Sequence, residues 1–158
     1  MAADRRFFFQ QGTEANADIF YFELAQAETT LTIAPLPAAA RGGAYEARPS
    51  LFGPWLYFTQ WRGKNDPADR VVRKMLSALE QTESHAAFED GMLNDYTDPG
   101  AMSDDLVLFA SEEGAGGGHD LFVGDFVLGW RSSLNRWVPG VNSLKDELSP
   151  TFWPRPLP

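Results

Sequence analysis

The 158-residue chain contains no cysteine, which excludes disulfide scaffolds, thiolate zinc sites and cysteine nucleophiles together. It also lacks any run of 18 apolar residues, and its N-terminus lacks an apolar segment of signal-peptide length. The sequence therefore predicts neither a membrane-spanning helix nor a secretory signal. These absences lead us to expect a cytoplasmic protein that makes no membrane contact.

Positive charge is scarce, because 13 Lys and Arg stand against 22 Asp and Glu, for a net charge of −9. A nucleic-acid-binding protein needs a basic surface, so we expect no direct contact with nucleic acid. Hydrophobic residues, at 44%, are sufficient for a folded core. The length fits one domain, which we place at residues 1–148, followed by a proline-rich tail at 149–158.

Apolar and β-branched runs predict strands near residues 7–11, 18–25, 29–34, 55–61, 106–109 and 121–130. A helix is predicted between the fourth and fifth of these runs. Asp66 and Pro67 form a helix-start signal, and apolar residues from Val72 to Leu79 recur at spacings of three and four. We therefore predict an α+β domain, in which a mainly antiparallel sheet of five to seven strands packs against one long helix at about 67–90. We find no convincing internal repeat.

Negative charge is concentrated in one part of the chain. Residues 80–125 hold twelve carboxylates and no Lys or Arg, whereas residues 1–63 have a net charge of only −1. Like charges without counterions repel one another, so this block predicts a docking face for a basic protein. The residues assigned to this predicted acidic face are Glu83, Glu89, Asp90, Asp95, Asp98, Asp104, Asp105, Glu112, Glu113 and Asp120.

An acidic face on a small chain without a catalytic motif favours a binding protein that blocks or neutralises a basic macromolecule. Immunity proteins and phage-encoded inhibitors of nucleic-acid-binding enzymes or toxins have this kind of composition, which is an argument from analogy. The simplest competing interpretation is a solvated surface that keeps the protein soluble. Binding that weakens steeply with salt would separate the two interpretations.

Metal binding and catalysis are alternatives that we do not assign. Asp95, Asp98, Asp104 and Asp105 carry oxygen ligands of the kind that Ca²⁺ or Mg²⁺ takes, but their spacing is not that of a calcium loop. The run Gly114–Gly118 is followed by strand-like sequence rather than by a helix start, so it does not predict a phosphate loop.

The two histidines define a further alternative, which is a small enzyme or ligand-binding protein with an aromatic pocket. His85 lies four residues before Glu89, and His119 precedes Asp120. We nevertheless assign no catalytic residue, no metal site and no cofactor. The last alternative is an assembly subunit, a homo-oligomer whose surface aromatics are buried by copies of itself.

Overall fold

The computed structural model describes residues 6–12, 17–23, 32–38, 40–41, 45–61, 69–80, 86–87, 96–111, 118–133 and 136. These residues form eleven β-strands and one turn of 3₁₀ helix, and they contain no α-helix. The elements are β1 (Arg6–Gln11), β2 (Asp18–Glu23), β3 (Ile33–Pro35), β4 (Tyr45–Phe52), β5 (Trp55–Trp61), β6 (Asp69–Met75), η1 (Leu76–Ala78), β7 (Ala86–Ala87), β8 (Tyr96–Ala101), β9 (Leu106–Ser111), β10 (Asp120–Asp125) and β11 (Trp130–Ser133).

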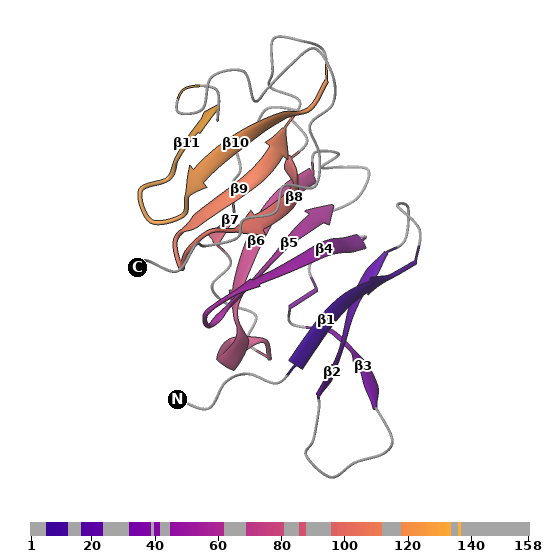
Figure 1. Ribbon diagram of the computed structural model, residues 1–158. Helices are drawn as coiled ribbons and strands as arrows, with labels where there is room; N and C mark the ends of the chain where they lie inside the picture. The colour runs from indigo at the N-terminus through magenta and orange to yellow at the C-terminus, as the bar shows by residue number, and fades with distance from the viewer. Residues whose placement is uncertain are drawn as a thin grey trace, which may run out of the picture.

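The strands form three antiparallel sheets in which each strand pairs with its neighbours in sequence. Sheet A has the order β1-β2-β3, sheet B the order β4-β5-β6-β7, and sheet C the order β8-β9-β10-β11. Figure 1 shows sheet B between the other two sheets. Strands β1 and β2 contact β4, whereas β8 contacts β4, β5 and β6. The molecule is therefore a stack of three sheets in the order A, B, C.

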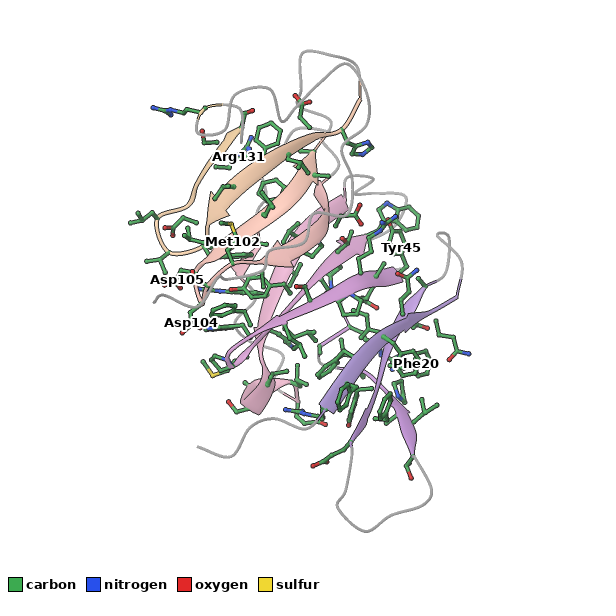
Figure 2. The ribbon with its side chains drawn as sticks, viewed as in Figure 1. Phe20, Tyr45, Met102, Asp104, Asp105 and Arg131 are labelled. Carbon is green, nitrogen blue, oxygen red and sulfur yellow. The ribbon has the colours of Figure 1, made fainter. Side chains whose placement is uncertain are left out.

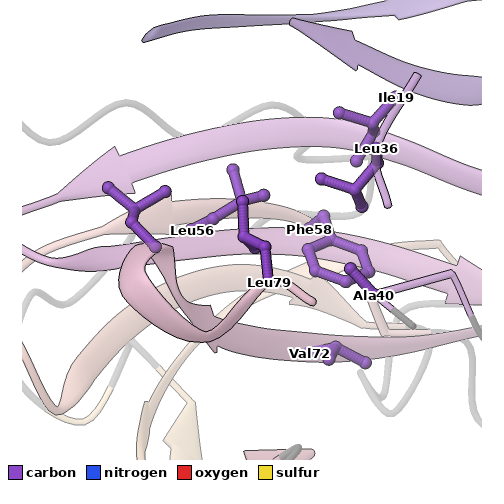
Figure 3. Packing of buried hydrophobic residues seen from close by; sticks show 8 residues of the cluster. Ile19, Leu36, Ala40, Leu56, Phe58, Val72 and Leu79 are labelled. Carbon is purple, nitrogen blue, oxygen red and sulfur yellow. The ribbon is translucent and has the colours of Figure 1, made fainter. Parts of the chain in front are cut away.

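Sheet B buries apolar side chains on both of its faces. Toward sheet A, Leu56, Phe58 and Val72 pack with residues of the first sheet and its following loop, and Figure 3 shows this cluster. Toward sheet C, Tyr57 and Val71 pack with residues of β8, β9 and β10. Successive residues of a strand point to opposite faces, so a strand covered on both sides is apolar throughout rather than alternating.

The predicted long helix is wrong, because β6 and the short turn η1 occupy residues 69–78. The apolar spacing from Val72 to Leu79 fits a helix, but Val71 and Val72 are adjacent β-branched residues that favour a strand. They point to opposite sheets, and both are buried. Because β6 is buried on both faces, it carries apolar residues on both, and their spacing resembles that of one apolar face of a helix. The fold is thus made of β-sheets.

The predicted single sheet is also wrong, because the strands are divided among three sheets. The antiparallel pairing is confirmed, and β1, β2, β5 and β9 lie where the sequence predicts strands. The run expected at 121–130 is wrong as a single strand, because β10 ends at Asp125, a turn follows, and β11 begins at Trp130. The proline-rich tail lies outside the described residues, so the domain boundary at 148 stays a prediction.

Sheets B and C repeat the same strand spacing. Strands β4, β5 and β6 begin at Tyr45, Trp55 and Asp69, and β8, β9 and β10 each begin 51 residues later. The first strand of each sheet is interrupted by a bulge that contains a residue with positive φ followed by proline. The sequence did not lead us to expect this repeat of strand spacing.

Candidate interaction surface

The outer face of sheet A, which points away from sheet B, is an apolar grid of six residues. Cross-strand pairing aligns them in two rows. In the first row Phe22 of β2 pairs with both Phe7 and Ile33, and in the second row Phe20 pairs with both Phe9 and Pro35. We call these residues the aromatic grid, and they are Phe7, Phe9, Phe20, Phe22, Ile33 and Pro35.

The grid follows from apolar runs that do not alternate with polar residues. In β1, the middle residue of the phenylalanine run, Phe8, packs against the core between sheets A and B, so Phe7 and Phe9 point outward. In β2, Ile19 is buried in the same core, which places Phe20 and Phe22 outward. An antiparallel sheet with one solvated face normally carries polar residues there.

The rings of the grid pack against one another across the two long strands. Phe7 stacks on Phe22 with ring centroids 5.2 Å apart and planes within 9°. Phe9 lies 6.1 Å from both Phe20 and Phe22. Cross-strand aromatic pairs of this kind stabilise a sheet. They also hold the rings in a fixed arrangement that presents their outer surface to solvent.

The aromatic grid is open to solvent at its two edge strands. Phe7 is 49% exposed and Ile33 is 57% exposed, while Phe9, Phe20 and Phe22 are half-buried. Among the described residues of this face, Asp18 is the one charged side chain, and it lies beyond the grid opposite Gln11. A contiguous apolar surface bordered by polar residues is a typical protein contact site.

A second aromatic cluster surrounds Arg73 between sheets B and C. The Arg73 guanidinium lies 4.3 Å from the Trp55 ring centroid and 4.8 Å from that of Phe126. It donates hydrogen bonds to the main-chain oxygen of Asp104 and, at 2.9 Å, to Asp105 Oδ1. The cluster therefore holds the β8–β9 turn against sheet B.

Tyr57 completes this contact between the sheets. Its hydroxyl donates hydrogen bonds to the main-chain oxygens of Ser103, at 2.9 Å, and Asp104, at 2.6 Å. Burial raises the pKa of Tyr57 to about 12, although Arg73 opposes the shift. The phenol therefore stays protonated at neutral pH and donates these hydrogen bonds. The rings of Trp55 and Phe126 already contact a cation of the same chain, the Arg73 guanidinium.

Another charged contact joins the two bulges. Asp98 is only 4% exposed, and its carboxylate forms an ion pair with Arg48 of β4. Both residues have positive φ, 56° for Arg48 and 55° for Asp98, and the Asp98 amide donates to Thr59 Oγ1 at 3.2 Å. Strained backbone of this type persists where surrounding contacts fix it. This pair fixes the position of β8 on β4.

A row of buried polar residues crosses the face of sheet B that points toward sheet A. Glu46, Gln60 and Arg70 pair across three adjacent strands, and each is almost fully buried. Lys74, four residues after Arg70 on the same face of β6, is also buried. Desolvation lowers the pKa of Lys74, although the charge of Glu80 opposes the shift. The row therefore lies in the interior between sheets A and B.

The structure describes four of the ten residues of the predicted acidic face, on β8, in the β8–β9 turn and at the start of β10. Asp98 and Asp105 are paired with arginines of the same chain, Asp104 has an exposed side chain, and Asp120 is half-buried at the start of β10. Figure 2 shows Asp104 and Asp105 far from Phe20 of the aromatic grid. The other six, Glu83, Glu89, Asp90, Asp95, Glu112 and Glu113, lie outside the described residues. Partner binding by this face stays a prediction.

Within the described ranges, no group of three or more His, Asp or Glu side chains is placed to hold a metal ion. His119 is half-buried just before β10, and His85 lies outside the described residues. No helix in the described part of the chain is long and apolar enough to cross a membrane.

Comparison of the chain with protein-family models, with curated proteins and with solved structures finds no match. The site must therefore be argued from its own chemistry. The sequence analysis missed the aromatic grid, although the run from Phe7 to Phe9 and the unbroken apolar segment from Ile19 to Phe22 indicated it. Apolar residues on both faces of a strand mean that both faces are to be covered.

Proposed function

We propose that this protein is a protein-interaction domain that binds an apolar, uncharged protein surface through the aromatic grid. The observation that carries this proposal is the exposure of Phe7 and Ile33 at the two edges of a face with stacked phenylalanines. Aromatic residues are enriched at protein interfaces, where their burial supplies much of the binding free energy. We place the protein in the cytoplasm, and the absence of cysteine supports this location.

This proposal differs in mechanism from the docking of a basic partner on the predicted acidic face. Of the four described residues of the predicted acidic face, Asp98 and Asp105 already have arginine partners within the chain. An arginine from another protein would have to displace those contacts. The aromatic grid requires no such exchange, because its rings already face solvent.

The experiment is site-specific photo-crosslinking in the cell that produces the protein. A photoreactive phenylalanine analogue replaces Phe7, or Leu128 as the control, because Leu128 is 70% exposed but lies outside the aromatic grid. We expect a covalent adduct to form from position 7 and not from position 128. Equal labelling from both positions, or none from position 7, would contradict the proposal.

A further inference from the structure

The outer face of sheet A differs from the other sheet faces of the molecule. Both faces of sheet B are covered by neighbouring sheets. On the face of sheet C that points away from sheet B, Leu108, Ala110 and Val123 are buried as well. The aromatic grid is thus the exposed apolar sheet face in the described part of the chain, and its geometry suits another sheet as the covering layer.

We propose that the layer that covers the aromatic grid is sheet A of a second copy of this chain, related by a twofold axis. This inference rests on the proposed function and names the partner. A twofold contact uses the same surface patch on both molecules, so the patch must be complementary to itself.

Charge opposes a contact between two copies less at sheet A than at sheet C. Two chains of net charge −9 repel, but residues 1–63 contribute only −1 to each chain, and residues 64–130 contribute −10. Sheet A lies on the opposite side of sheet B from sheet C, which contains Asp104, Asp105, Asp120 and Asp125. Contact through sheet A therefore keeps these four carboxylates of the two copies far apart, and Asp18, at the end of β2 beyond the grid, is the one described carboxylate on the contacting face. At physiological salt the Debye length is about 8 Å, so repulsion between exposed charges that lie further apart than this is largely screened.

Shape also favours a twofold contact. An axis along the central strand β2 places β1 of one copy over β3 of the other. Each edge phenylalanine then faces a smaller residue of the second copy, with Phe7 opposite Ile33 and Phe9 opposite Pro35. Phe20 and Phe22 face their own counterparts across the axis. Rings pack against aliphatic side chains at the edges and against rings at the centre, as in an aligned pair of sheets.

The size of the aromatic grid sets the expected strength of the contact. A stable interface buries about 800 Å² on each partner, formed by roughly 20–30 residues. Six side chains supply the centre of such an interface and not its full area. We therefore expect a dimer whose population depends on protein concentration within the range of a solution experiment.

The test is sedimentation velocity on the full chain over a series of protein and salt concentrations. We expect the sedimenting mass to rise from one chain toward two as concentration increases. Phe7→Ser and Ile33→Ser should each weaken dimerisation at least about tenfold, because each substitution occurs twice in a symmetric dimer. Val127→Ser and Leu128→Ser, at residues 66% and 70% exposed, are the matched controls and should leave it unchanged.

Salt gives an independent readout. An apolar contact between two acidic molecules should tighten as salt rises, because repulsion is screened. Attraction between the acidic block of one copy and cations of another would weaken with salt. Dimers that weaken with salt, or that persist in both Phe7→Ser and Ile33→Ser, would form through another surface and would overturn this inference, while crosslinking at position 7 would still decide the proposed function.

A wild-type chain that stays monomeric at the highest soluble concentration would overturn the second-copy inference alone. The crosslinking experiment at position 7 would then still decide the proposed function, because its adduct would contain a different protein. Circular dichroism and thermal unfolding of the serine variants establish that they fold. Phe7→Leu, which keeps the surface apolar, should retain the dimer if the loss in Phe7→Ser reflects contact rather than misfolding.

Discussion

Replacing Arg73 with alanine tests whether the charged cluster between sheets B and C stabilises the stack. The guanidinium is buried, contacts the rings of Trp55 and Phe126, and donates to the main chain of Asp104 and the carboxylate of Asp105. The substitution removes all four interactions. It also leaves the β8–β9 turn without its anchor on β6.

The expected loss of stability can be estimated from these contacts. A hydrogen bond from a charged donor contributes about 1.5–3 kcal/mol, and each ring contact of a buried guanidinium about 1–2 kcal/mol. The Asp105 side chain is 49% exposed, so its ion pair adds less than about 1 kcal/mol. Removing the guanidinium from water costs several kcal/mol and offsets part of the sum. We expect Arg73→Ala to lower the free energy of unfolding by about 2–4 kcal/mol.

The assay is urea unfolding followed by circular dichroism, with Arg41→Ala as the matched control. Arg41 has an exposed side chain, so its replacement changes the net charge equally and should shift stability by less than about 0.5 kcal/mol. Arg73→Lys should be intermediate, because lysine keeps the charge and loses the planar guanidinium. If Arg73→Ala and Arg41→Ala were equally stable, the cluster would contribute nothing net, and our reasoning about it would be wrong.

Two further predictions concern the same region. Because burial raises the pKa of Tyr57 to about 12 from 10.0, the unfolded chain releases the phenolic proton at lower pH than the folded chain. The free energy of unfolding should therefore fall between pH 10 and 12, by up to about 2–3 kcal/mol. Urea titrations at a series of pH values should show a smaller alkaline loss in Tyr57→Phe than in the wild type. Equal losses in the two proteins would contradict the raised pKa of Tyr57. Gly53→Ala should cost about 1–2 kcal/mol, because Gly53 has φ of 53° and an added Cβ would lie 2.9 Å from Asp104 Oδ1. The loss on thermal unfolding should exceed that of Gly129→Ala, where φ is 65° and nothing lies within 4 Å; equal losses would mean that Asp104 moves aside freely.

Strands were predictable where the apolar run was bounded by turn residues. The segment Trp55–Trp61, preceded by Pro54, shows this clearly. Strands β4 and β8 were missed because each contains proline, which normally interrupts a strand. In the structure these prolines follow Arg48 and Asp98 at bulges, where the ladder is already broken. Bulges depend on the partner strand, so a local pattern does not reveal them.

The residues of the candidate sites were predictable only in part, because charge in the sequence does not show where charge is neutralised in the fold. Asp98 pairs with Arg48 from another sheet, and Asp105 pairs with Arg73. Arg48 and Arg73 lie outside residues 80–125, so the charge count of that segment could not show that they neutralise two of its carboxylates. The aromatic grid had a local signal in the run from Phe7 to Phe9, but its meaning required the pairing of three strands.

The position of sheet A has a consequence for the architecture as a whole. Sheet A shields Leu56, Phe58 and Val72 of the middle layer from water. The strands that do so are apolar on their other side as well. Covering sheet B with sheet A therefore leaves an apolar face exposed to water on the outside of sheet A. Among the described residues, the outer face of this last layer is apolar rather than polar, which is the feature on which the proposed contact rests.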